Sequence, residues 1–227
     1  MRDGLTSAFF YAGVLVVGAI LTFFFVRWMA RVRGTAVPAI GSLRTLGAGA
    51  AAGLGASLGS GALYYLTKRP AIASPLWPAL KPSRFIGNLG PAAIEEVGFR
   101  GGVVQVCASA WGSTAGLLAG SIPFGTLHLL GFMFGRPPSF AHVVGVSAGG
   151  WLLSFLYLRY ELLAAFGCHW IWNSLAANWT RAFQLPRDSG MVLFEGAWTT
   201  DVVLVLLCVG LHVGQPLESM TSSGIQT

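Results

Sequence analysis

The chain has 227 residues, of which 54% are hydrophobic and only 10% are charged, and its mean hydropathy is +0.67. This composition excludes a soluble globular domain as the main interpretation and is typical of a protein that crosses the membrane several times. The net charge of +6 is spread over the predicted loops, which indicates membrane topology and contact with lipid headgroups rather than a nucleic-acid surface.

The first ninety residues predict two membrane-spanning helices followed by a loop. Residues 7–29 form an apolar run that ends in the basic cluster Arg27, Arg31 and Arg33, so we expect a span here and not a cleaved signal peptide. Residues 43–67 carry glycine and alanine at steps of three and four, which favours close packing against another helix. Residues 68–90 are rich in proline, and we expect a loop or an interfacial stretch rather than a helix.

Five further apolar segments follow along the chain. We expect spans at about 91–111, 113–134, 140–158, 162–181 and 197–214, with a polar loop at 182–196 and a polar tail after 214. The predicted fold is therefore an all-α transmembrane bundle of about seven spans. It divides into an N-terminal part, 1–90, a core, 91–181, and a C-terminal part, 182–227.

Three charged residues, Glu95, Glu96 and Arg100, lie in the segment 91–111, which is otherwise mostly apolar. Charges inside a membrane segment are expensive, face the protein interior and point to function. If the segment is helical, Glu96 and Arg100 are four residues apart and lie about 40° apart on one face, so they can form an ion pair. Glu95 then points elsewhere, which leaves one carboxylate for chemistry beside one that is neutralised by a structural partner.

Two later segments each contain a histidine that lies on the same helical face as another candidate residue. Phe124 and His128 are four residues apart in the segment 113–134, and His169 and Asn173 have the same spacing in the segment 162–181. The positions along the three segments allow one polar pocket in the helix core, near one membrane face. Such a pocket can activate water with a carboxylate and an imidazole, and it can stabilise an oxyanion with an imidazole and an amide.

The same residues match the motifs of a known family. EEVGFR at 95–100 fits EExxxR, FGTLH at 124–128 fits FxxxH, and HWIWN at 169–173 fits HxxxN. The chain thus resembles the CPBP family of glutamic intramembrane proteases, which includes the type II CAAX prenyl endopeptidases and Abi-type proteins. The resemblance implies that Glu95 and His128 activate the water and that His169 and Asn173 line the oxyanion hole. Glu96 and Arg100 would hold the first motif in shape, with Phe124 as further structural support, and the reaction would use no metal and no other cofactor.

The partners that follow from this resemblance are the lipid bilayer and a membrane-associated protein or peptide substrate, with no nucleic acid. Substrate choice stays open among prenylated CAAX termini, bacteriocin-like peptides and the C-terminal sorting tails that myxosortase-type members process. Arginine greatly outnumbers lysine, which favours a bacterial origin and hence an integral protein of the bacterial inner membrane.

Two other interpretations keep the same residues. In the first, Glu95, His128 and His169 bind zinc and a metal-bound water is the nucleophile, although the sequence lacks an HExxH motif. In the second, the protein is a transporter or a non-catalytic membrane partner whose buried Glu, His and Arg residues relay protons or bind a solute. Inverted sequence repeats would favour the transporter, and none is apparent.

Overall fold

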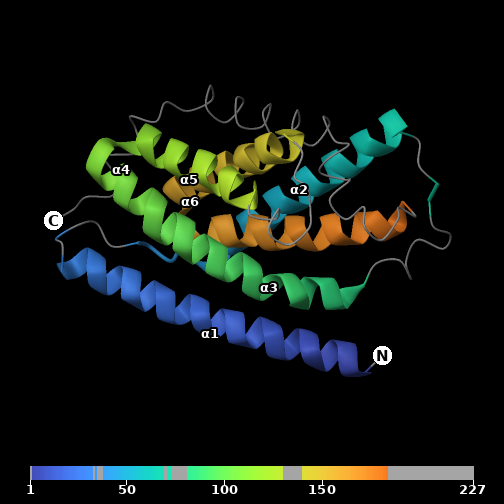
Figure 1. Ribbon diagram of the computed structural model, residues 1–227, viewed down its shortest axis with the longest axis horizontal. Coiled ribbons are helices and arrows are strands. Elements are labelled where there is room, and N and C mark those ends of the chain that lie inside the picture. The colour runs from blue at the N-terminus through green and yellow to red at the C-terminus, as the bar shows by residue number, and fades with distance from the viewer. Residues whose placement is uncertain are drawn as a thin grey trace.

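A computed structural model describes residues 2–32, 34, 38–68, 71–72, 81–129 and 140–183, and this part of the chain contains helices and no strands. The elements in chain order are α1 (Arg2–Val32), α2 (Leu43–Lys68), α3 (Pro82–Glu96), the π-helix η2 (Val97–Val104), α4 (Gln105–Trp111), α5 (Ser113–Leu127) and α6 (Phe140–Ala182). Figure 1 shows them as one bundle, with α1 along one side. The predicted span at 197–214, most of the loop before it and the polar tail lie outside the described residues.

The small residues of α2 pack directly against the backbone of α6. A Cβ atom added at Gly49 would collide with the backbone of Ala164, and one added at Gly53 would collide with the backbone of Cys168. Such close approach is what a stripe of small residues permits between membrane helices. The predicted role of this segment as a closely packed helix is therefore confirmed.

The helix that carries the charged motif begins earlier than predicted. Interpreting all of 68–90 as a loop is wrong, because α3 begins at Pro82 and continues through Pro91 into η2 and α4. Pro82 occupies the first turn, where a missing backbone N–H costs nothing, so this proline starts a helix instead of preventing one. Glu95 consequently lies in the middle of a long helical segment and not near its start.

The predicted spans 140–158 and 162–181 are the two halves of α6, and they join at Glu161. This residue has a non-helical backbone, with φ 71° and ψ −179°. A Cβ atom added at Gly149 would lie 4.0 Å from Trp172, whereas 23 residues of straight helix would separate these positions by about 34 Å. The two halves therefore fold back on each other. The backbone N–H groups of Leu162 and Leu163 donate to the carbonyls of Ala39 and Ile40, which satisfies two of the N–H groups in the first turn of the second half.

The described residues include three helical stretches that are long and apolar enough to cross a membrane, Gly13–Val32, Leu43–Leu66 and Val143–Ala176, the last of which contains the break at Glu161. Large apolar side chains on α1 also point outward, with Phe24 64% exposed and Trp28 57% exposed. Exposed apolar surface of this extent suits contact with lipid. The protein is therefore an integral membrane protein built of helices, while the count of seven spans stays a prediction.

Candidate active site

The ion pair predicted from the sequence is present and completely buried. Arg100 Nη1 donates to Glu96 Oε1 at 3.1 Å, and neither side chain is exposed. Arg100 Nη2 also donates to the backbone carbonyl of Gly150 in the first half of α6, at 3.1 Å. The guanidinium carbon lies 4.5 Å from the centre of the Phe124 ring, a distance that suits a cation–π contact. Arg100 thus connects η2 to both α5 and α6.

The π-helix sets the position of Arg100. Glu96 is the last residue of α3, and η2 begins directly after it and includes Arg100. A π-helix is wider than an α-helix and occurs frequently at functional sites. Its presence between the glutamates and the rest of the helical segment could not be read from the sequence, because VGFRGGVV has no distinct π-helical pattern.

His169 lies between the two glutamates. Its Nδ1 is 2.6 Å from Glu96 Oε1, and its Nε2 is 3.8 Å from Glu95 Oε2. Because a carboxylate accepts and cannot donate, the short contact assigns a proton to Nδ1 and turns Nε2 toward Glu95. Glu96 Oε1 therefore accepts hydrogen bonds from both Arg100 and His169. This contact was missed by the sequence reasoning, which paired Glu96 with Arg100 alone.

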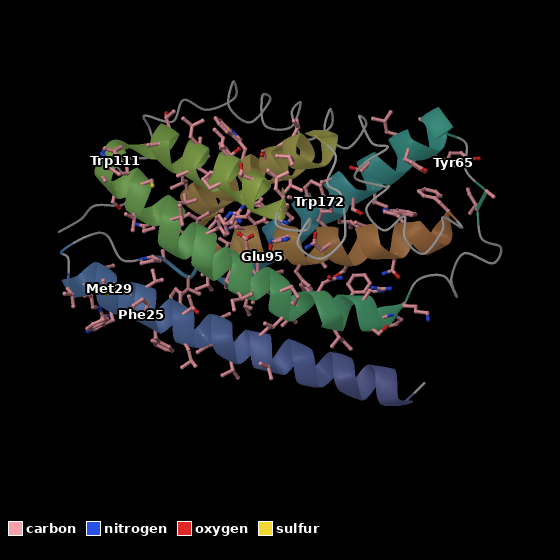
Figure 2. All side chains as sticks on the ribbon, in the orientation of Figure 1. Phe25, Met29, Tyr65, Glu95, Trp111 and Trp172 are labelled. Atoms are coloured by element: carbon pink, nitrogen blue, oxygen red, sulfur yellow. The ribbon has the colours of Figure 1, made fainter. Side chains whose placement is uncertain are left out.

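The two glutamates differ in their access to the surroundings. The Glu96 side chain is completely buried, whereas the Glu95 side chain is 37% exposed. Figure 2 shows Glu95 midway along the bundle. Glu95 is thus the more accessible of the two carboxylates, and its depth in the bilayer stays a prediction.

Phe124 brings the second motif to this cluster. Its ring centre is 5.0 Å from that of His128 and 6.1 Å from that of His169, and its side chain is buried. His128 Nδ1 donates to the backbone carbonyl of Phe124 at 2.8 Å, which orients the ring and makes Nε2 the acceptor nitrogen of a neutral imidazole. Phe124 therefore separates the two imidazoles and fixes the spacing between them.

Asn173 is the least engaged of the predicted residues. It follows His169 by one turn of α6 and is partly buried, and its amide makes no hydrogen bond to any other described residue. The structure therefore brings Glu95, Glu96, Arg100, His169 and Phe124 into direct contact and places His128 beside Phe124. Among the described residues, no group of three His, Cys, Asp or Glu side chains could hold a metal ion.

These features define a class: a helical integral membrane protein whose core holds a carboxylate, two imidazoles and a buried Glu–Arg pair. Residues 78–175, which include all three motifs, match the family model described as type II CAAX prenyl endopeptidase Rce1-like. This match supports the CPBP family assignment that the motifs predicted. No curated protein and no solved structure matches the chain significantly. The match supports a membrane protease of the CAAX-protease-like kind, and such a protease implies a membrane-associated protein or peptide as substrate.

Proposed function

We propose that the protein is a glutamic intramembrane endopeptidase in which Glu95 and His128 activate the attacking water. The observation that carries this proposal is the unequal pair of glutamates: Glu96 is buried against Arg100 and His169, while the neighbouring Glu95 is accessible. In such an arrangement Glu96 has a structural role, and Glu95 is available as the general base of acid–base catalysis.

In the proposed reaction, Glu95 takes a proton from water as the water oxygen attacks the carbonyl carbon of the scissile peptide bond. The carbonyl oxygen becomes an oxyanion, which the side chains of His169 and Asn173 stabilise by donating hydrogen bonds. The carbon–nitrogen bond then breaks, and the leaving nitrogen receives the proton that Glu95 had taken. His128 helps to hold and polarise the water through Nε2, since its Nδ1 is occupied by the Phe124 carbonyl.

Glu96 has a specific task in this scheme. His169 donates from Nδ1 to Glu96, so it can donate from Nε2 to the oxyanion only as the imidazolium. The negative charge of Glu96 stabilises that imidazolium, and Arg100 keeps Glu96 in place. The two acidic residues of the first motif therefore have different tasks. Glu95 takes the proton from the water, and Glu96 supports His169, which donates to the oxyanion.

A comparison of protein termini can identify the physiological substrate, because an endopeptidase creates a new terminus at each bond that it cleaves. Membrane fractions from the native host with wild-type protein and with Glu95→Gln are compared by mass spectrometry, with a strain that lacks the gene as a second reference. We expect a membrane-associated protein or peptide to accumulate uncleaved in both altered strains. Identical termini in all strains would argue against an endopeptidase and favour a non-catalytic membrane protein. Because the bacterial inner membrane is the proposed location, inner-membrane fractions are the ones to compare.

A further inference from the structure

An apolar cavity lies on the side of the bundle where α1 packs. Its volume is about 340 Å³, and its walls come from α1, from the junction of α3 and η2, and from the second half of α6. The α1 side chains that line it include Val16, Ile20 and Phe23, and Leu162 and Phe166 face them from α6. A volume of this size falls in the range of ligand sites, about 300–1,000 Å³. The cavity is therefore large enough for a hydrocarbon chain.

The mouth of the cavity faces the surroundings of the bundle and not its core. Ile20 is 49% exposed and Phe24 is 64% exposed, and both contribute to the lining. Figure 1 shows that α1 lies at the edge of the bundle, beside α3. In a membrane, an apolar opening at such an edge meets lipid chains before it meets water.

The face of α1 that lines the cavity also carries two arginines, one and two turns further along the helix. Ile20, Phe23, Arg27 and Arg31 follow one another at steps of three and four residues, which keeps them on one face of the helix. Arg27 is held in place, because its guanidinium carbon lies 5.4 Å from the Phe23 ring centre and its Nη1 donates to the Pro38 carbonyl at 3.3 Å.

The end of the bundle next to these arginines is basic. Arg44 opens α2 just after the 38–42 segment, and Arg159 lies two residues before the reversal of α6, whose next residues bond to Ala39 and Ile40. Ile40 itself lines the cavity. Among the described residues near this reversal, Glu161 is negatively charged, whereas Arg27, Arg31, Arg44 and Arg159 are positively charged. The apolar cavity thus ends at a patch of net positive charge.

We propose that this cavity binds an anionic glycerophospholipid of the bilayer, with one acyl chain between α1 and α6 and the phosphate group at Arg27 and Arg31. The apolar lining and the adjoining cations are complementary to the two parts of such a lipid, since basic pockets between membrane helices bind anionic headgroups. Glu96 contributes to the inner wall, whereas Glu95 does not line the cavity. The lipid site therefore lies behind the first motif, on a different side from the accessible carboxylate.

The test uses the full-length protein purified in a neutral detergent, with phosphatidylglycerol and phosphatidylcholine of identical acyl chains as probes. Native mass spectrometry measures binding, and melting in the same detergent measures stabilisation. We expect the wild-type protein to bind phosphatidylglycerol more tightly and to melt at a higher temperature with it. The double variant with Arg27→Gln and Arg31→Gln is expected to weaken this binding about 25-fold, if each cation near the headgroup contributes about fivefold.

Two further variants separate the parts of the site. Ile20→Trp fills the cavity mouth and is expected to reduce binding while both arginines remain. Arg84→Gln removes an exposed cation near the start of α3, away from the cavity lining, and is the matched control that should bind like wild type. If the double variant does not fold, Arg31→Gln alone replaces it, because this side chain is exposed.

Three results would overturn the proposal. Equal binding of the two lipids by the wild-type protein would show that the site does not select the net negative charge of the headgroup. Unchanged phosphatidylglycerol binding in the arginine variants would remove Arg27 and Arg31 from the site. Displacement of the lipid by a prenylated peptide without phosphate, to the same extent in wild type and the double variant, would assign the cavity to a substrate anchor instead.

Discussion

Removal of Glu96 is expected to damage the fold more than removal of Arg100, and the hydrogen bonds explain the order. After Glu96→Ala, Arg100 keeps the Gly150 carbonyl and the Phe99 and Phe124 rings but no acidic partner in hydrogen-bond contact, and His169 Nδ1 loses its acceptor. After Arg100→Ala, Glu96 still accepts from His169. Breaking a fully buried ion pair costs about 3–5 kcal/mol. We place Glu96→Ala at the upper end of this range and Arg100→Ala at the lower end.

The double variant tests whether the loss comes from an unpaired charge. With both side chains removed, no buried charge remains without its partner, so we expect part of the stability to return. Recovery will be incomplete, because His169 still lacks its acceptor and a cavity replaces two side chains. Glu96 Oε2 and Arg100 Nε already have no hydrogen-bond partner among the described residues, so the wild-type network is only partly satisfied.

Melting in detergent, together with the yield of folded protein, measures these effects. Glu95→Ala is the matched control, since it removes the neighbouring carboxylate, which is 37% exposed, and we expect it to change stability by less than about 1 kcal/mol. If both single variants melt like wild type while proteolysis is lost, Glu96 and Arg100 act in the reaction and not in the stability of the fold. Their role as a buried structural ion pair would then be wrong.

The site and the helix packing lead to three further predictions. Glu95→Gln and His128→Ala are each expected to lower the cleavage rate by about 10²–10⁴ with the protein still folded in the membrane, and a purified Glu95→Gln variant that cleaves at the wild-type rate would refute the proposed base. Cleavage is expected to survive EDTA and phenanthroline; loss of activity that added zinc restores would instead support the metalloenzyme interpretation. Gly53→Leu is expected to reduce the yield of folded protein, because even a Cβ atom there meets the Cys168 backbone, whereas Gly55→Ala, which has open space around it, should express like wild type. Equal yields of the two glycine variants would show that α2 can move away from α6.

The sequence predicted the parts of the fold that depend on composition and spacing. The four-residue step from Glu96 to Arg100 was enough to predict their ion pair, and the small residues of α2 were enough to predict a close contact. Both follow from the geometry of a single helix. The three motifs, taken together, also led to the family that the comparison supports.

Contacts between distant segments were harder to predict. The bond from Glu96 to His169 joins residues 73 positions apart, and the bond from Arg100 to Gly150 ends on a backbone carbonyl that no side-chain pattern reveals. The start of α3 was misjudged because a proline at the first turn looks the same in the sequence as a proline that breaks a helix. The catalytic roles of Glu95, His128, His169 and Asn173 stay predictions until the variants are measured.

The reversal of α6 at Glu161 has a consequence for how this protein can change during evolution. Gly150 and His169 lie 11 and 8 residues from Glu161, and each contacts a different residue of the same Glu96–Arg100 pair. One residue inserted or deleted between either position and Glu161 would turn that contact by about 100° and shift it by about 1.5 Å along the helix. Insertions and deletions between residues 150 and 169 should therefore abolish activity even where every motif residue is retained. New substrate preferences must then arise by substitution, or by length changes in loops outside 150–169.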